Sequence, residues 1–335
     1  MDTLIQNTLR CAVIGHGSWA TALVKVLTMN EPISWFVHTP EVLESLRTEG
    51  RNCRYLADVE FDMNRINLSD DVNEIVANAD IIFLVTPAAY LKRYLADLKV
   101  SLKEKMIVSA IKGIIPEENQ FVTDYLKQNY GLSGAQVCFI GGPTHAEEVG
   151  HGRLTYMTLA CSNPGKARIV GEKLKTPFLR INYVRNMHYL ERSAVLKNIY
   201  AVMVGMAAGL GYGDNFISVL VSNCIKEMYF LLDPRSVNDL TKFDPSNFFG
   251  DLLVSCYSSH SRNRQLGMLI GRGNTVKTAL NEMTMVAEGY FASAMLPFLS
   301  EEQQAQLPIA MTAYKVMHQD MSARKAMKEL ESLLM

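Results

Sequence analysis

The segment CAVIGHGSWATAL at residues 11–23 constrains the fold of this chain more than any other stretch. A short apolar run, expected to be a buried strand, breaks at Gly15 and Gly17, and a helical pattern begins at Thr21. This G-x-G-x-x-A spacing is typical of the turn that binds a dinucleotide. The first glycine permits a tight turn, the second lets a pyrophosphate approach the backbone, and the small Ala20 lets the helix pack on the strand. The segment therefore predicts phosphate binding at a helix N-terminus, and the alternative is a glycine turn without a ligand.

Composition places the chain among globular proteins with two domains of ordinary size. Its 335 residues are 48% hydrophobic and 20% charged, and its formal net charge is −1 at pH 7. A nearly neutral chain has no overall field that attracts nucleic acid. The apolar run at 199–210 is too short to span a bilayer. We therefore expect neither nucleic-acid binding nor stable membrane insertion.

The cysteines and the N-terminal residues predict a cellular location. The six cysteines are scattered and form no C-x-x-C pair, which favours reduced thiols. The opening sequence MDTLIQNTLR lacks the apolar core of a signal peptide. Both features predict a cytoplasmic protein.

The first half of the chain alternates short apolar runs with amphipathic segments. Strands are expected at 9–15, 33–37, 81–85, 106–110, 137–141, 155–161 and 178–183. Helices are expected at 21–29, 41–49, 72–77, 90–98, 117–128 and 166–173. This alternation predicts an α/β domain with a mostly parallel, doubly wound sheet of the Rossmann type over residues 1–187, which would bind NAD(P).

The pattern changes after residue 186, where strand-like runs almost vanish. Long helices are expected at 189–208, 216–232, 261–270, 286–299 and 309–317. Residues 188–335 are therefore expected to form an all-α domain that carries substrate binding and catalysis. Its apolar helical surfaces favour a homodimer.

Lys197 is the strongest candidate for a catalytic group. It lies with Asn198 in AVLKNIYAVMVGMAAGL at 194–210, a helix that is apolar nearly all round and therefore central in its domain. Burial and a nearby cation would both lower the pKa of a lysine toward neutrality, so that it could exchange a proton with a substrate oxygen. The alternative is a lysine that extends to the surface of the helical domain.

Further candidates follow the ends of expected strands. Lys112 comes after the strand at 106–110, where ligands bind in doubly wound folds, and it could contact an anionic substrate. After the strand at 137–141, Gly142 lets the backbone approach a ligand, and Thr144 can cap a helix or offer a hydroxyl. His145 and His151 flank two glutamates, but without H-E-x-x-H spacing, so no metal site is predicted.

The helical half contains a candidate phosphate site. Ser261, Arg262 and Asn263 open an apolar helical pattern, and a serine cap, a guanidinium and a helix N-terminus together bind phosphate well. Asp251 could orient a lysine or cap a helix. Glu288 could bond a ribose or an amide, or could only begin a helix.

His38 bears on the choice of cofactor. It stands at the end of the second expected strand, where NAD-specific folds carry an acid for the ribose 2′-hydroxyl. The histidine leaves room for a 2′-phosphate, so the cofactor is expected to be NADP or NAD.

Seven segments together resemble the bacterial type of the NAD(P)-dependent glycerol-3-phosphate dehydrogenase family. They are GHGSWATAL, AIKGI at 110–114, GGPTHAEEV at 141–149, VLKN at 195–198, GDLL at 250–253, SRNRQLG at 261–267 and VAEGY at 286–290. They occur in the family's order and cover nearly the whole chain. The chain departs from the family pattern at 218–226, at 245–249 and at Ala20, which suggests a divergent branch.

The resemblance implies a role for each matching residue. Lys197 matches the proton acceptor of the family. The substrate contacts would be Lys112, Gly142, Thr144, Asp251, Ser261, Arg262 and Asn263. The cofactor contacts would be the loop glycines with Ser18, Trp19, His38, Lys112, Ala146, Arg262, Val286 and Glu288.

The implied reaction interconverts sn-glycerol 3-phosphate and dihydroxyacetone phosphate, a phosphorylated triose, and feeds glycerophospholipid synthesis. One alternative is a related two-domain dehydrogenase for another hydroxy acid or an acyl-CoA. Hydroxyacyl-CoA dehydrogenases use a His–Glu pair where this chain has Lys197, and His188 with Glu191 is the nearest imitation. Another alternative is a dinucleotide-binding regulator without catalysis.

Overall fold

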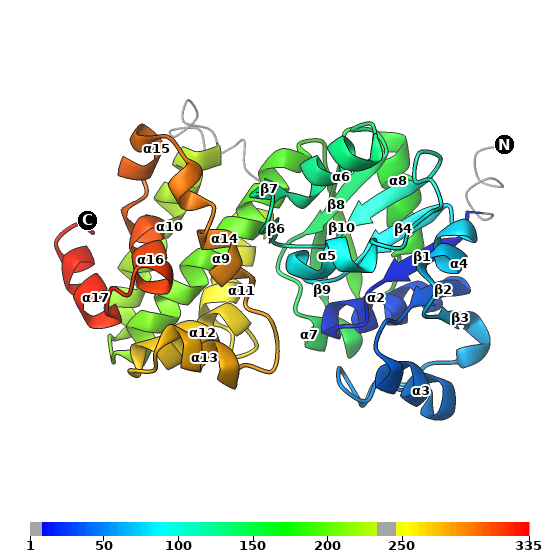
Figure 1. The fold of residues 1–335 in the computed structure, drawn as a ribbon, viewed down its shortest axis with the longest axis horizontal. Helices are drawn as coiled ribbons and strands as arrows, with labels where there is room; N and C mark the ends of the chain where they lie inside the picture. The colour runs from blue at the N-terminus through cyan, green and yellow to red at the C-terminus, as the bar shows by residue number, and fades with distance from the viewer. Residues whose placement is uncertain (1–8, 233–245, 335) are drawn as a thin grey trace. The chain divides into compact units, whose positions relative to one another are not determined.

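The computed structural model describes residues 9–232 and 246–334 and divides into two compact units. The first unit comprises residues 1–111 and 122–187, and the second comprises residues 112–121 and 188–335. Figure 1 shows the sheet of the first unit and the helices of the second. Among the described residues, no helix is long and apolar enough to cross a membrane.

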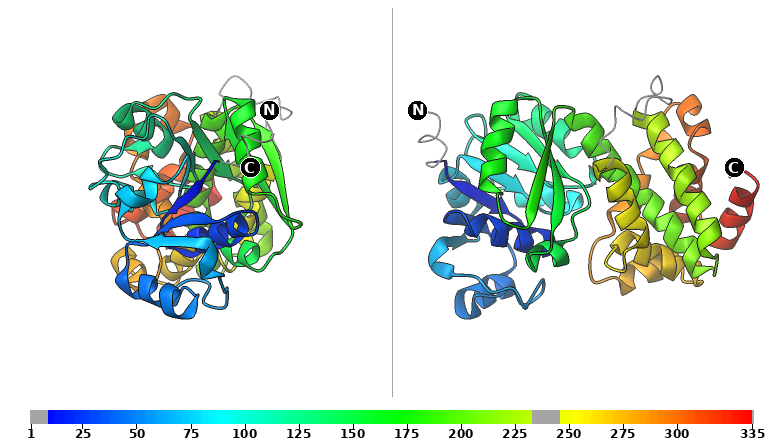
Figure 2. Two further views of the ribbon diagram at one scale, coloured as in Figure 1. Left: turned by 90° about the vertical axis from the view of Figure 1, so that its right-hand side faces the viewer. Right: turned by 180° about the vertical axis from the view of Figure 1, so that it is seen from behind.

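The first unit is built on an eight-stranded sheet with the order β10-β9-β8-β5-β4-β1-β2-β3 (Figure 2). All neighbouring pairs are parallel except β8 and β9. The strands are β1 (Cys11–Ile14), β2 (Ile33–Phe36), β3 (Ile66–Ser69), β4 (Ile81–Leu84), β5 (Met106–Ser109), β8 (Val137–Gly141), β9 (Thr155–Cys161) and β10 (Leu179–Val184). The order reverses at β1, so the predicted doubly wound sheet is confirmed.

Helices connect the strands of this sheet, since parallel neighbours require crossovers. They are α2 (Ser18–Thr28), α3 (Pro40–Glu49), α4 (Val72–Ala77), α5 (Ala88–Tyr94), α6 (Val122–Tyr130), α7 (Ala146–Gly150) and α8 (Pro164–Lys173), with a short 3-10 turn at Met63–Arg65. Strands β1, β2 and β4 are buried at every position, which explains their continuous apolar sequences.

In the residues that the structure describes, the second unit is helical apart from a two-stranded ribbon of β6 (Ile114–Ile115) and β7 (Gln120–Phe121). Its helices are α9 (Met187–Gly209), α10 (Asp214–Leu232), α11 (Asp251–Tyr257), α12 (Arg262–Gly271), α13 (Val276–Glu282), α14 (Glu288–Ser293), α15 (Glu301–Ala305), α16 (Pro308–His318) and α17 (Ala323–Glu331). A π-helical turn at Ser246–Gly250 precedes α11, and a 3-10 turn lies at Leu296–Phe298.

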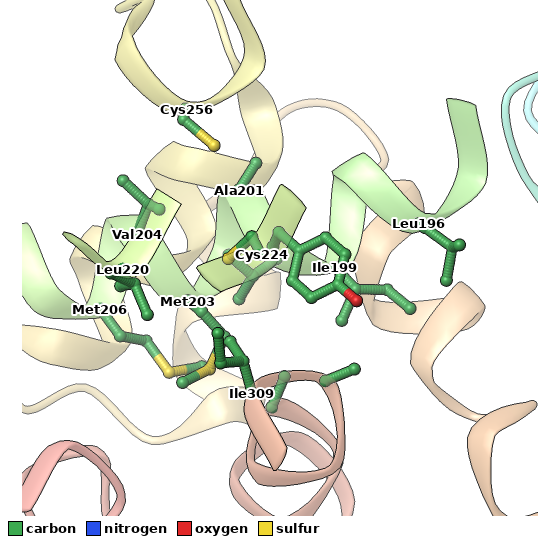
Figure 3. Close-up of a cluster of buried hydrophobic side chains, with 14 of the residues drawn as sticks. Leu196, Ile199, Ala201, Met203, Val204, Met206, Leu220, Cys224, Cys256 and Ile309 are labelled. Carbon is green, nitrogen blue, oxygen red and sulfur yellow. The ribbon is translucent and has the colours of Figure 1, made fainter. Parts of the chain in front are cut away.

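Helix α9 supplies much of the core of the second unit, as Figure 3 shows. Ile199 and Met203 of α9 belong to the same buried cluster as Leu220 of α10 and Ile309 of α16. Cys224 and Cys256 fill space in this cluster as buried free thiols. The nearly uniform apolar sequence of α9 is thus explained by burial on most of its circumference.

Glycines bring α9 and α12 into backbone contact. A Cβ on Gly205 would lie 2.1 Å from the carbonyl oxygen of Arg264, and one on Gly267 would lie 1.9 Å from that of Val202. Gly209 and Gly271 meet the partner helix in the same way one turn later. The close approach fixes the start of α12 relative to α9, where Lys197 lies.

Residues 112–121 correct the expected domain boundary. They were expected in the first domain, within 1–187, but they belong to the second unit. Ile114 is fully buried in the second core, and Arg192 lies over the Phe121 ring at 5.1 Å from its centroid. Apolar burial is a long-range effect that the local sequence did not reveal.

Some elements also differ from those expected. The helix expected at 117–128 begins only at Val122, because 120–121 pairs with 114–115 as a ribbon. Strand β3 was not predicted, since only two of its four residues are buried and its sequence INLS is half polar. Of the divergent segment 245–249, residue 245 lies outside the described residues, and Phe248 packs on Tyr229 with ring centroids 4.7 Å apart.

Candidate active site

The glycine-rich turn between β1 and α2 fits a dinucleotide phosphate. Gly15 has φ +124°, and a Cβ there would lie 2.1 Å from the carbonyl oxygen of Val85, so only glycine is accommodated. Gly17 precedes α2, and a Cβ added to it would meet no described atom within 4 Å. The backbone beside Gly17 is therefore open, and the first turn of α2 presents N–H groups there.

Buried side chains hold this turn in place. Trp35 of β2 donates its indole N–H to the carbonyl oxygen of Gly15 at 2.7 Å. Asn52 donates to the carbonyl oxygen of His16 and to the Thr21 hydroxyl, both at 2.9 Å. The turn is thus fixed before any ligand arrives.

Ser18 and Trp19 are the first residues of α2. Ser18 is buried, and Ala20 is fully buried against the strand, as the fingerprint predicts. The Trp19 indole N–H is buried and has no hydrogen-bond partner among the residues that the structure describes.

The loop after β8 leads into the short helix α7. Gly142 has φ +103°, a conformation that favours glycine. The Thr144 hydroxyl donates to the carbonyl oxygen of Gly142 at 3.3 Å, and His145 stands at the N-cap position of α7 without a side-chain cap bond. Ala146 begins α7, which packs against α2 and so places this loop near the glycine-rich turn.

His38 lies exposed just after β2. The neighbouring Thr39 hydroxyl is 2.8 Å from Nε2 of His16 in the glycine-rich turn, which brings the end of β2 to that turn. Arg93 of α5 donates from Nη2 to Nε2 of His38 at 3.1 Å. A histidine at the end of β2 and an arginine of α5 therefore lie side by side.

In the second unit, two lysines share one buried carboxylate. Lys197 of α9 donates from Nζ to Oδ1 of Asp251 at 2.5 Å and to the Ser255 hydroxyl at 2.8 Å. The Lys112 ammonium lies 3.5 Å from Oδ2 of Asp251. Lys197 is only 6% exposed and Asp251 only 1%. Lys197 therefore does not extend to the surface of the helical domain, and that alternative is wrong. Asp251 orients a lysine, which was one of the two roles considered for it.

Lys112 of this cluster has a pKa that departs clearly from its ordinary value. The pKa of Lys112 is lowered to about 8, mainly by burial and also by the charge of Lys197, although Asp251 acts in the opposite direction. A lysine with a pKa near 8 changes its charge in the range where dehydrogenases work.

A chain of amides extends the cluster to α12 and α14. Asn198 donates to the carbonyl oxygen of Lys112 at 2.8 Å and accepts from the Asn263 amide at 2.9 Å. The Asn263 side-chain oxygen accepts the N–H of Gly289 at 2.8 Å. A Cβ on Gly289 would lie 2.4 Å from the carbonyl oxygen of Asn198, so this contact needs glycine.

The start of α12 carries the predicted phosphate residues. Ser261 caps the helix, since its hydroxyl accepts the N–H of Arg264 at 3.3 Å. Arg262 is the first helical residue and is half-buried. Val286 is half-buried, and Glu288 begins α14 with Gly289 next to it.

The structure thus brings Lys112, Lys197, Asp251 and Asn263 into one network within the second unit. Sequence reasoning missed two members as site residues, Asn198 and Ser255. The polarity of Asn198 in an apolar helix was a signal for it, whereas Ser255 lies one turn after Asp251 on a helix that was not predicted. No cluster of metal-binding side chains occurs among the described residues.

These features define a class of protein. A doubly wound sheet with a glycine-rich turn after β1, in one chain with a helical unit that buries a lysine–carboxylate cluster, is the arrangement of two-domain NAD(P)-dependent dehydrogenases.

Comparison with known proteins identifies the family. Residues 10–167 match the family model described as the N-terminus of NAD-dependent glycerol-3-phosphate dehydrogenase, and residues 188–328 match its C-terminus. The chain therefore belongs to the NAD-dependent glycerol-3-phosphate dehydrogenase family, and its enzyme class is that of NAD(P)-dependent oxidoreductases. The resemblance expected from the sequence is confirmed.

Individual relatives agree with this assignment. A glycerol-3-phosphate dehydrogenase [NAD(P)+] from Agathobacter rectalis is 33% identical over 324 residues, which cover 96% of this chain and 95% of the relative. A glycerol-3-phosphate dehydrogenase [NAD(P)+] from Chlorobium phaeobacteroides is 30% identical over 331 residues, which cover 96% of this chain and 97% of the relative. The crystal structure of a glycerol-3-phosphate dehydrogenase from Coxiella burnetii has the same fold, with a TM-score of 0.84 at 23% identity over 96% of this chain and 98% of that one.

Proposed function

We propose that this protein interconverts sn-glycerol 3-phosphate and dihydroxyacetone phosphate, with hydride transfer to or from NAD(P)(H). The observation that carries the proposal is the buried cluster in which Lys197 and Lys112 share Asp251. Family membership supports the reaction, and the cluster supplies the proton chemistry that the reaction needs.

Lys197 moves the proton of the substrate C2 oxygen in this proposal. The bound nicotinamide cofactor supplies or accepts the hydride at C2. In reduction, Lys197 donates a proton to the oxygen that becomes the hydroxyl, and in oxidation it accepts that proton. Asp251 and the Ser255 hydroxyl fix the position of the ammonium group, so the proton is delivered from one place.

Lys112 and Asn263 orient the substrate. The Lys112 ammonium adds positive charge beside Lys197 and attracts a phosphorylated triose. Arg262 and the N-terminus of α12 offer charge-assisted hydrogen bonds to the phosphate, with Ser261 as the cap. Gly142 and Thr144 are proposed as further substrate contacts in the first unit.

The first unit holds the dinucleotide in this proposal. Gly15, Gly17 and Ser18 form the pyrophosphate site, because the backbone is open there and meets a helix N-terminus. The remaining proposed cofactor contacts are Trp19, His38 and Ala146 in the first unit, and Lys112, Arg262, Val286 and Glu288 in the second. Residues 1–187 are accordingly proposed as the NAD(P)-binding part, without 112–121, and residues 188–335 as the substrate-binding part.

The deciding experiment follows the absorbance of NADPH, and separately of NADH, when dihydroxyacetone phosphate is added to the purified protein. Rapid oxidation of either cofactor is the expected result. Cofactor binding without turnover on this substrate, but with turnover on a hydroxy acid or an acyl-CoA, would transfer the assignment to a related dehydrogenase. Binding without any turnover would support a regulator.

Three broader features belong to the same proposal. The product sn-glycerol 3-phosphate would supply the backbone of glycerophospholipids. The protein would act in the cytoplasm, as expected from its scattered reduced cysteines. It would be a homodimer, which light scattering tests by a mass of twice 37.5 kDa.

A further inference from the structure

Arg93 places positive charge beside the end of β2, where a dinucleotide ribose binds in this fold class. His38 and Arg93 are both exposed, and the Arg93 guanidinium donates to the His38 ring at 3.1 Å. They come from different elements, since His38 follows β2 and Arg93 lies in the last turn of α5. An NAD-specific site would instead present a carboxylate here to the ribose 2′-hydroxyl.

The nearest following acid in the chain is engaged elsewhere. Glu41 lies in the first turn of α3, three residues after His38, and its carboxylate forms an ion pair with Arg54. The Arg54 guanidinium therefore compensates part of the Glu41 charge. The pKa of His16 in the glycine-rich turn is lowered to about 4. Burial is the largest cause, followed by electrostatic repulsion from His38 and Arg54.

Aromatic rings lie beside His38 and connect it to the helix that contains Arg93. Tyr94 lies next to Arg93, and its ring centroid is 5.4 Å from that of His38 and 5.8 Å from that of Phe36. The His16 ring also stacks on Tyr94, with ring centroids 6.1 Å apart. Tyr94 thus connects α5 to the end of β2 and to the glycine-rich turn, so Arg93 is held at the ribose end of that turn.

We propose that Arg93 is a specificity-determining residue that, with His38, binds the 2′-phosphate of NADP(H), so that this protein prefers NADP(H) to NAD(H). The inference rests on the proposed dinucleotide site of the first unit and adds to it a residue from α5 that the fingerprint does not contain. A guanidinium forms two parallel hydrogen bonds to phosphate oxygens, which a ribose hydroxyl cannot match.

The first test measures binding rather than turnover. Isothermal titration calorimetry of the full chain compares adenosine 2′,5′-bisphosphate with adenosine 5′-monophosphate, two probes that differ only in the 2′-phosphate. We expect the 2′-phosphorylated probe to bind about tenfold or more tightly, since charge-assisted hydrogen bonds discriminate by this order. Equal affinities overturn the proposal. Failure of both probes to bind overturns it as well, and shows that the dinucleotide site itself is wrong.

The second test removes the guanidinium. Arg93→Gln should weaken only the 2′-phosphorylated probe, by about tenfold, and Arg93→Lys should restore part of the loss. Arg47→Gln, an exposed arginine in the last turn of α3, makes the same change in charge and should alter neither affinity. A loss that is equal for both probes, or that Arg47→Gln reproduces, would show that Arg93 does not recognise the 2′-phosphate.

A kinetic readout complements the binding data. In Arg93→Gln, KM for NADPH should rise while kcat and KM for NADH stay near their original values, because the guanidinium is not part of the proton-transfer cluster. A fall in kcat with both cofactors would contradict the proposal.

Discussion

At the scale of single residues, Lys197 depends on its two acceptors. A buried ammonium is unfavourable unless it is paired and hydrogen-bonded, and Lys197 bonds both the Asp251 carboxylate and the Ser255 hydroxyl. In the proposed reaction, this arrangement would hold the Lys197 amine at one place in a largely buried site, where electrostatic interactions are stronger than in water.

We expect Lys197→Met to lose activity and remain folded. The methionine has a similar length and no proton to exchange, and Asp251 keeps Lys112 as a partner. Loss of a positioned acid–base group typically lowers kcat about 10²–10⁴-fold. NADPH oxidation with dihydroxyacetone phosphate measures the loss, and circular dichroism checks the fold. Lys226→Met, on the exposed side of α10, is the control; near-normal turnover in Lys197→Met would remove the assignment.

Lys112 predicts an alkaline limit to activity. Burial, reinforced by Lys197, lowers the pKa of Lys112 to about 8, so its charge is present below pH 8 and lost above it. If that charge attracts the substrate, kcat/KM for dihydroxyacetone phosphate falls as the pH rises through 8. Lys112→Arg should move this fall in kcat/KM to higher pH, since arginine stays protonated. If kcat/KM of the variant falls at the same pH as before, the titrating group is not Lys112.

At the scale of elements, a buried carboxylate joins three helices of the second unit. Glu227 of α10 accepts the backbone N–H groups of Ile309 and Ala310 at 2.6 and 3.1 Å, and the Tyr200 hydroxyl at 3.1 Å. It therefore caps the N-terminus of α16 from another helix, where the preceding Leu307 offers no side-chain cap.

The titration of Glu227 should make the free energy of unfolding fall as the pH rises. Burial raises its pKa to about 7, although the hydrogen bonds from Ile309 and Ala310 lower it. A raised folded-state pKa gives stability that is present at low pH and is lost as the pH rises from about 4.5 to 7. Glutamine does not titrate. The free energy of unfolding of the wild type minus that of Glu227→Gln should therefore fall by up to about 3 kcal/mol between pH 4.5 and 8.

Urea denaturation followed by far-ultraviolet circular dichroism measures this difference at both pH values. Glu301→Gln, an exposed acid in the first turn of α15, is the matched control and should show no such trend. A difference that stays constant with pH would mean that Glu227 has an ordinary pKa in the folded chain.

At the scale of the whole molecule, the two units are not two consecutive pieces of chain. Residues 112–121 leave the first unit after β5, contribute Ile114 to the second core, and return at α6. Lys112 therefore belongs structurally to the unit that contains Lys197 and Asp251.

Ile114→Ala tests this division. Removing a fully buried isoleucine side chain from the second core should cost about 2–5 kcal/mol. We expect faster hydrogen exchange in α9 and α10, measured by mass spectrometry, with little change in β1 and β4. Ile107→Ala in β5, also fully buried, should give the reverse pattern. Faster exchange confined to the first unit in Ile114→Ala would contradict the division.

The sequence alone determined the fold class and most of its elements. Buried parallel strands such as β1 and β4 are continuous apolar runs, and the glycines after β1 mark a turn that only glycine can make, so local chemistry is sufficient there. The sequence also indicated that Lys197 has a partner if it is buried, because a lysine is almost never buried without one. The short edge strand β3 and helix α11 carry weaker periodic signals and were missed.

Tertiary structure alone decided which partners these residues meet. Nothing near Lys197 in the sequence indicates that its partners are Asp251 and Ser255, or that Lys112 shares the carboxylate. Glu227 caps a helix that begins 81 positions later in the chain, at Pro308. Burial lowers the effective dielectric and makes such long-range pairings necessary, and a linear pattern contains no record of which distant residues are buried together.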